Sequence, residues 1–217
     1  MLEFGAVVGN STLRRNSHIE PLRIFVSYSQ LDNVSSPDRR NSGLVNYFRR
    51  QVRWRLREEG MPDDAILWQD RSEIERGDVW SDARKIALNR AELFVVILSK
   101  NYITRPWFKQ ELGAMKSRVE TLGETASASR IFLVYKDKVP ESQVPDNVRI
   151  TEAVRFYLDH NPNVVDNSDA LFDPRIRRLS REYDKALLAF TSAIHRRVDE
   201  LRTANALSFL TDSASPS

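Results

Sequence analysis

The feature that most constrains this fold is the unbroken apolar run LFVVIL at residues 93–98. The run contains no polar residue and shows no alternation, so a strand formed here must be covered on both faces. The centre of a parallel sheet, with helices on either side, provides that cover. A buried helix can also contain an apolar run of this length, so the interpretation depends on the neighbouring segments.

The neighbouring segments alternate between strand-like and helix-like patterns. Strand-like runs lie at residues 22–28, 65–69, 93–98, 131–135 and, more weakly, 153–158. Between the first two, residues 39–59 repeat an apolar residue every four positions, at Leu44, Phe48, Val52 and Leu56. Gly60 and Pro62 then supply a helix stop. This alternation predicts a flavodoxin-like α/β domain, with five parallel strands in the order 2-1-3-4-5 and helices on both faces.

Two further helices are predicted on either side of the central run. Residues 79–90 predict one, with Asp78 as its N-cap and a buried stripe formed by Val79, Ala83, Ile86 and Ala87. The other begins at Pro106, whose missing N–H costs nothing in a first helical turn. Its expected buried residues follow helical spacing: Phe108, Leu112, Met115 and Val119.

The remaining segments lie at the two ends of the domain. Residues 1–20 lack any period and predict a flexible arm, so the domain is expected over residues 21–201. A loop is expected from 159 to about 174, followed by a long amphipathic helix over about 175–201. That helix is longer than the sheet needs; its second half either packs on the domain or docks on a partner or a second copy. Residues 202–217 are small and polar and predict a disordered tail.

Composition excludes several classes of protein. The chain has no cysteine, which rules out disulfides and thiolate chemistry, and its three histidines show no ligand spacing, so no metal site is expected. The net charge of +3 is too small to indicate nucleic acid, and the basic run at 175–181 is expected on a solvated helix face. No segment approaches the ~18 apolar residues of a membrane span. The expected protein is cytoplasmic, with no membrane or nucleic-acid partner.

The topology also predicts where a ligand binds. In an open parallel sheet that place lies beyond the carboxyl ends of the strands, where the strand order reverses. Here it collects residues 27–30, 70–80 and 99–107. No glycine-rich phosphate loop is present, which excludes Rossmann dehydrogenases and P-loop enzymes. A response-regulator receiver domain is excluded as well, because Ser99 follows the third strand, and Ser29 and Gln30 follow the first, where it needs acidic residues.

The helix that begins at Pro106 carries the most informative polar residue. Trp107 and Glu111 are four residues apart, so they share a helix face near the strand ends. Spacing alone leaves two interpretations open. Glu111 is either a first-turn acid favoured by the helix dipole, with Trp107 as a partly buried anchor, or it belongs to a functional site.

Three segments together resemble Toll/interleukin-receptor (TIR) domains, over roughly residues 22–158. RIFVSYS at 23–29 resembles their first strand, and LWQDRSEIERGD at 67–78 resembles their second strand and BB loop. LSKNYITRPWFKQEL at 98–112 resembles their third strand, its connecting loop and the W-x-x-x-E helix. Some members of this family, bacterial ones included, hydrolyse or cyclise NAD through the glutamate of that motif, whereas many animal adaptors only assemble.

The resemblance implies that the chain is an NAD+ nucleosidase or cyclase of the bacterial type, acting in defence signalling, with Glu111 as the catalytic residue. NAD is then the substrate, and no cofactor is required. Substrate contacts are expected from Phe25, Ser27, Tyr28, Asp70 and Trp107, although Asp70 has the alternative role of capping its loop and Trp107 that of anchoring its helix.

The resemblance also implies self-association through the BB loop, with Arg76, Gly77 and Trp80 as assembly residues, and a partner effector or sensor protein. Two alternatives remain open. One is a non-enzymatic scaffold or host-mimicking effector that acts by TIR–TIR contact. The other is a base-processing enzyme of the nucleoside deoxyribosyltransferase kind.

Overall fold

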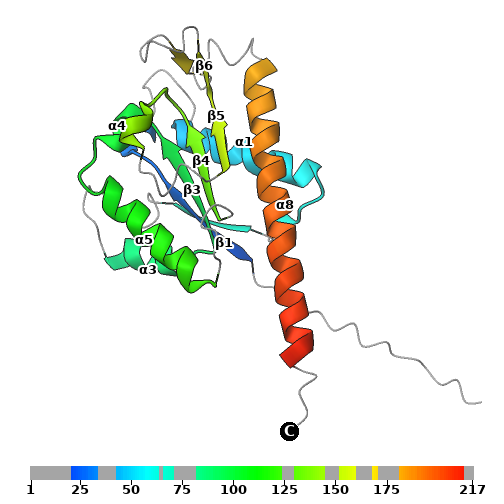
Figure 1. Ribbon diagram of the computed structural model, residues 1–217. Helices are drawn as coiled ribbons and strands as arrows, with labels where there is room; N and C mark the ends of the chain where they lie inside the picture. Colours follow the sequence, from blue (N-terminus) through cyan, green and yellow to red (C-terminus); the bar gives the residue numbers. More distant parts are fainter. Residues whose placement is uncertain are drawn as a thin grey trace, which may run out of the picture.

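The computed structural model describes residues 21–33, 43–63, 66–70, 82–123, 130–144, 152–159, 168–170 and 181–212. Its centre is a parallel sheet with helices on both faces and a long C-terminal helix, as predicted (Figure 1). The strands are β1 (Leu22–Ser27), β2 (Ile66–Asp70), β3 (Leu93–Leu98), β4 (Ile131–Tyr135) and β5 (Glu152–Arg155). They are ordered β2-β1-β3-β4-β5, and every pair is parallel.

The apolar run at residues 93–98 forms β3, and all of its residues are buried. β3 lies between β1 and β4, and Ile24 of β1 pairs with Leu93 at its start. The sheet separates two hydrophobic layers. The first contains Ile24, Val26, Val95 and Ile97 together with α1 (Leu44–Glu58) and α8 (Arg181–Asp212). The second contains Phe25, Phe94 and Val96 together with α3 (Asp82–Arg90) and α5 (Phe108–Thr121).

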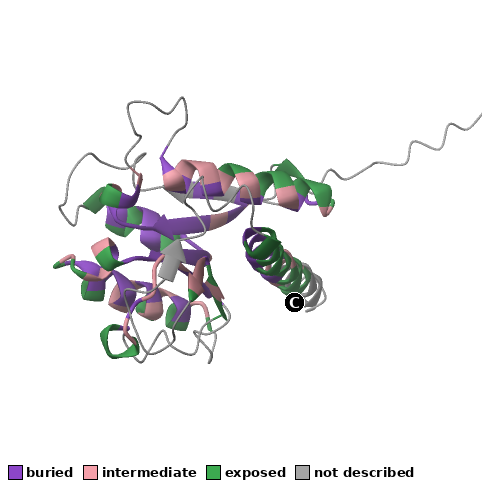
Figure 2. Ribbon diagram, turned by 90° about the horizontal axis from the view of Figure 1, so that it is seen from above, coloured by how far each residue is buried: buried purple, intermediate pink, exposed green. Residues whose placement is uncertain are grey.

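Helix α1 follows its predicted pattern except at its start, because it begins at Leu44 and not at residue 39, and Val45 is buried where Leu44 was expected. Val45, Phe48, Val52 and Leu56 are its buried residues, and they belong to the hydrophobic layer that α1 shares with the sheet. Figure 2 shows the helix with buried and exposed residues on opposite sides. Gly60 adopts a φ of 87° after its last turn, and the amide of Met61 donates to the carbonyl of Leu56 at 2.9 Å, so the helix ends where the sequence indicated.

The N-terminus of α1 is capped from a distant segment. The side chain of Asn33, in the short 3-10 helix η1 (Gln30–Asn33), accepts from the amides of Val45 at 3.0 Å and Asn46 at 3.3 Å. Gly43 allows this approach, because a Cβ there would lie 1.9 Å from the carbonyl oxygen of Asn33. The cap fixes η1, which follows β1, against the first turn of α1.

The buried stripe predicted for the second helix is right for Ala87 but wrong for Ala83 and Ile86. In α3 the buried residues are Arg84, Ala87 and Leu88, whereas Ala83 is exposed and Ile86 is 51% exposed. The helix is therefore rotated relative to the predicted face. Its apolar pattern is short, and the charged residue Arg84 occupies a position that hydrophobic spacing assigns to solvent. Asp78 and Val79 lie outside the described residues.

The fifth strand-like run is interrupted at Phe156. β5 covers only Glu152–Arg155; the next residues form β6 (Tyr157–Asp159), which pairs antiparallel with β7 (Ser168–Ala170) inside the predicted loop. The amide of Phe156 still donates to the carbonyl of Tyr135 in β4 at 2.7 Å, so the chain leaves the sheet only after this residue. The ring of Phe156 is fully buried beside Phe48 at 5.4 Å and Tyr183 at 5.6 Å between ring centroids, in the same α1/α8 layer that Val154 contacts.

The long C-terminal helix packs on the domain over more than its first half. Its buried stripe runs from Tyr183 through Phe190 and Ile194 to Leu201. His195 and Thr191 contact Glu59 at the end of α1, each at 3.2 Å. The helix continues to Asp212, into the segment that the sequence assigned to the tail, and residues 171–180, at its expected start, lie outside the described part of the chain.

Candidate active site

A short connection positions the W-x-x-x-E helix against the carboxyl end of the sheet. β3 ends at Leu98, and the Ser99 hydroxyl then caps the four-residue helix α4 (Lys100–Ile103) by accepting from the amide of Tyr102 at 2.9 Å. A turn leads from α4 into α5, whose N-cap is Trp107. α5 therefore begins at Phe108, slightly after the predicted start at Pro106. Its expected apolar residues, Phe108, Leu112, Met115 and Val119, are all buried.

Glu111 lies in the first turn of α5 and is 1% exposed. Its carboxylate oxygen Oε2 accepts a hydrogen bond from the hydroxyl of Tyr102 at 3.2 Å. That hydroxyl also bonds the hydroxyl of Ser27, the last residue of β1, at 2.7 Å. Three side chains from β1, α4 and α5 thus meet at the carboxyl end of β1, where the topology predicts a ligand site.

Trp107 is buried beside the same tyrosine. The rings of Tyr102 and Trp107 meet edge to face, with centroids 5.8 Å apart. The guanidinium carbon of Arg84, from α3, lies 5.1 Å from the centroid of the Trp107 ring, within cation–π range. Arg84 is itself 1% exposed. It brings a positive charge into the layer that contains Glu111.

Arg84 and Tyr102 were not among the predicted site residues. Arg84 lies three and four residues before the buried Ala87 and Leu88, so helical spacing places it on their face once that face is known. Tyr102 lies in the segment that resembles the third TIR motif, but nothing in local spacing indicates that its hydroxyl reaches both β1 and α5.

A second polar cluster lies beside α4. The carboxylate of Asp32, in η1, accepts hydrogen bonds from the Ser99 hydroxyl at 2.5 Å and from the side-chain amide of Asn101 at 2.9 Å. It also forms an ion pair with the Lys136 ammonium at 3.3 Å. Lys136 follows β4 and also contacts Asp137 at 3.1 Å. Burial by itself lowers the pKa of Lys136, but the charges of Asp32 and Asp137 outweigh burial, and the pKa is raised above its ordinary value.

The predicted substrate-binding residues lie in different places. Ser27 and Trp107 both lie beside Tyr102, and Phe25 is fully buried in the same α3/α5 layer. Tyr28 belongs to the opposite α1/α8 layer, and its hydroxyl accepts from Asn33 at 3.5 Å. Asp70 is the last residue of β2 and pairs with Val26, but its side chain is outside the described set. The assembly residues Arg76, Gly77 and Trp80 also lie outside the described residues.

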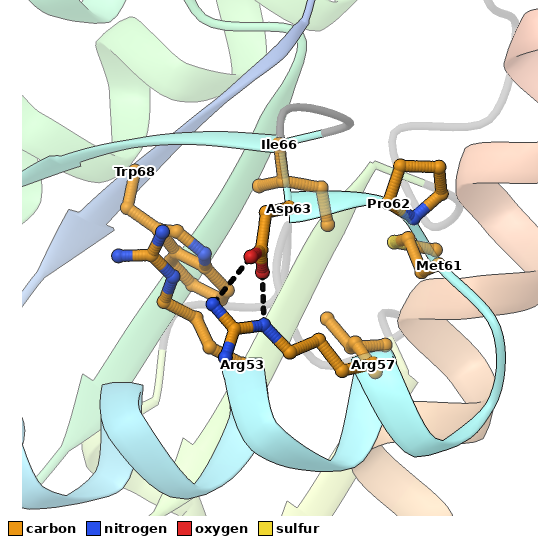
Figure 3. A pocket seen from close by; sticks show the side chains of 8 residues that line it. Arg53, Arg57, Met61, Pro62, Asp63, Ile66 and Trp68 are labelled. Carbon is orange, nitrogen blue, oxygen red and sulfur yellow. Dashed lines mark hydrogen bonds and ion pairs between the residues drawn. The ribbon is translucent and has the colours of Figure 1, made fainter.

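A small pocket lies away from this site (Figure 3). Leu56, Ile66 and Trp68, which line it, all belong to the α1/α8 layer, and an Arg57–Asp63 ion pair closes one side. Its volume of about 20 Å³ has room for about one water molecule. The pocket is therefore too small for a nucleotide, and its apolar lining lies on the opposite side of the sheet from α5.

Two absences concern the part of the chain that the structure describes. No group of three or more histidine, aspartate or glutamate side chains within those residues is arranged to hold a metal ion. None of the helices found there combines the length and apolar composition required to cross a bilayer.

The fold and site together define a doubly wound α/β domain with a buried carboxylate at the carboxyl edge of its sheet. Comparison with protein families gives a match to the TIR domain model over residues 24–171, which is more than half of the chain. The chain therefore belongs to the TIR domain family. No curated protein matches the chain.

Proposed function

We propose that this TIR domain cleaves the nicotinamide–ribose bond of NAD, with Glu111 as the catalytic residue. The supporting observation is the position of that carboxylate. It lies at the carboxyl end of β1, next to the point where the strand order reverses, and the Tyr102 hydroxyl holds it in a water-poor layer. An acidic residue that serves only the helix dipole can do so while it is exposed to solvent, whereas Glu111 is buried.

A single carboxylate is sufficient for this reaction. When the bond between ribose C1′ and the pyridine nitrogen breaks, its electron pair moves to the nitrogen, and nicotinamide leaves as a neutral molecule without a general acid. The positive charge moves to C1′ and the ring oxygen, as in glycoside hydrolysis. A negative carboxylate in a low-dielectric site stabilises that charge as it develops.

The attacking group then decides the product. Water attacking C1′ gives ADP-ribose and releases one proton, whereas attack by an adenine nitrogen of the same molecule gives a cyclic ADP-ribose isomer. Trp107, beside Tyr102, is 5% exposed and has Arg84 over its ring, so it would offer an aromatic face to a ring of the substrate only after these covering residues move.

Access to Glu111 is part of the proposal, because a side chain that is 1% exposed cannot touch a dinucleotide until its covering residues move. Self-association through the BB loop, involving Arg76, Gly77 and Trp80, is the proposed cause of that movement. The setting would be bacterial defence signalling in the cytoplasm, with a sensor or effector partner. Activity should therefore rise steeply with protein concentration.

The test is nicotinamide release from NAD across a protein concentration series, with nucleosides assayed in parallel. Glu111→Gln and Glu111→Ala should lower turnover by at least ~100-fold, the usual effect of removing one charge-stabilising group. Glu120→Gln is the matched control, because Glu120 lies on the same helix but is exposed. Full turnover in the Glu111 variants, or cleavage of nucleosides in preference to NAD, would reject the proposal.

A further inference from the structure

We propose that Tyr102 is a positioning residue that fixes the orientation of the Glu111 carboxylate through its hydroxyl. The inference rests on the proposed function of Glu111 and assigns a role to a residue that does not itself reach the substrate. The hydroxyl of Tyr102 contacts the carboxylate of Glu111 at 3.2 Å, and its effect on the reaction passes through that contact.

The directions of the hydrogen bonds follow from the chemistry of the three groups. An ionised carboxylate only accepts, so the Tyr102 phenol donates its one proton to Glu111 Oε2. The bond between Tyr102 and Ser27 must then be donated by the Ser27 hydroxyl. The resulting chain runs from Ser27 to Tyr102 to Glu111, and each hydroxyl proton in it has one acceptor. Charge-assisted bonds of this kind are about twice as strong as neutral ones.

Tyr102 is held rigidly enough to perform this role. Its ring packs edge to face against Trp107 at 5.8 Å and Phe108 at 5.3 Å, between centroids. Its backbone is fixed by the Ser99 cap of α4, and the Ser99 hydroxyl is in turn bound by the buried Asp32 carboxylate. A four-residue helix has little stability of its own, so these external contacts determine where the phenol lies.

The role of the contact is to select one arrangement of a mobile side chain. A glutamate has three rotatable bonds, and a carboxylate aimed away from ribose cannot stabilise the charge that appears there. The attraction between the Glu111 carboxylate and the ribose becomes strong only as the nicotinamide–ribose bond breaks. Losing the orientation of the carboxylate should therefore lower kcat and leave KM unchanged.

The first experiment does not depend on activity. Urea unfolding is measured for the wild type, Tyr102→Phe, Glu111→Met and the double variant; methionine keeps the length of the side chain but has no carboxylate oxygen to accept from the phenol. If the phenol donates to the carboxylate, the two single effects are not additive. Tyr183→Phe combined with Glu111→Met is the control, because Tyr183 is a buried tyrosine in the opposite layer, and there the effects should add. Additive effects for Tyr102 and Glu111 would overturn the proposal.

The second experiment is kinetic. Tyr102→Phe keeps the ring packing, and we expect kcat for nicotinamide release to fall by about 10- to 100-fold, as for a lost bond to a charged group, with KM within about twofold. Ser27→Ala should give a smaller fall that adds nothing in the Tyr102→Phe background, since Ser27 acts through Tyr102. Tyr183→Phe should leave both constants unchanged.

The outcomes separate this inference from the proposed function. An active wild type with unchanged kcat in Tyr102→Phe, or with a change in KM alone, rejects the positioning role and leaves Glu111 as the catalytic residue. A wild type that is inactive at every concentration rejects both. In that case non-additive unfolding would mean that the Tyr102–Glu111 contact serves stability alone.

Discussion

Replacing Asp32 by alanine removes the acceptor at the centre of the polar cluster beside α4. Ser99, Asn101 and Lys136 all contact this carboxylate, whose side chain is 1% exposed. Breaking a buried ion pair by deleting one partner typically costs ~3–5 kcal/mol, because the other charge stays buried. The Lys136 side chain is 17% exposed and keeps its contact with Asp137. We therefore expect a loss at the lower end of this range, ~3 kcal/mol.

The loss is measurable by urea denaturation and by thermal unfolding. For a domain of this size, ~3 kcal/mol corresponds to a decrease in Tm of roughly 6–12 °C, and the urea midpoint should fall without a change in slope. Asp82→Ala is the control, because Asp82 also pairs with a lysine, Lys85 at 2.9 Å, but on the surface, and its removal should leave the midpoint nearly unchanged.

A second variant separates the charge from the packing. Asp32→Leu combined with Lys136→Met removes both charges and fills the space with apolar groups, and it should unfold at a higher urea concentration than Asp32→Ala. If Asp32→Ala were as stable as Asp82→Ala, the cluster would contribute nothing and the reasoning would be refuted.

Two other predictions concern pH and assembly. The pKa of Lys136 is raised in the folded protein, so its contribution to stability is complete below the unfolded pKa of about 10.4 and is lost as the pH rises through the folded value. Urea unfolding at several pH values from about 9 upward should therefore show a steeper alkaline loss for the wild type than for Lys136→Met, and parallel curves would contradict this. Gly77→Arg should lower NAD cleavage most at low protein concentration and reduce self-association by light scattering, whereas Glu111→Ala should abolish cleavage without changing self-association. Loss of a cellular response in Gly77→Arg but not in Glu111→Ala would instead favour a scaffold.

The parts of the fold that are set by periodicity could be predicted from the sequence. The run at residues 93–98 has no polar residue on either face, and a segment of that kind fits few environments besides a central strand. The spacing of Phe108, Leu112, Met115 and Val119 likewise determines which face of α5 is buried. Both patterns are local, and each is repeated often enough to outweigh a single exception.

The elements that were missed depend on contacts between distant segments. The fifth strand-like run is divided because the residues after Phe156 pair with β7, at residues 168–170, and no pattern around residue 156 indicates that pairing. The buried face predicted for α3 omitted Arg84, because the guanidinium of this residue packs over the ring of Trp107, the N-cap of α5. A charged residue is normally assigned to solvent, and its partner cannot be read from local spacing.

In the candidate site, too, local spacing was predictable and contacts between distant segments were not. The spacing predicted that Trp107 and Glu111 lie close together near the strand ends; both are buried and both contact Tyr102. The contact between Ser27 and Tyr102 joins residues 75 positions apart, so it emerges only when β1 and α4 are brought together. The roles of the predicted substrate and assembly residues remain predictions for the experiments above.

The sheet divides the hydrophobic core into two layers, and only one of them holds the proposed catalytic groups. Glu111, Tyr102, Trp107 and Arg84 all lie on the α3/α5 side, whereas α8 packs on the other. Substitutions in α8 are therefore expected to change the free energy of unfolding more than the geometry of the proposed catalytic groups. Under the proposed function, the exposed surface of α8 can be changed to bind new partners while the opposite side of the sheet keeps Glu111 and Tyr102 in place.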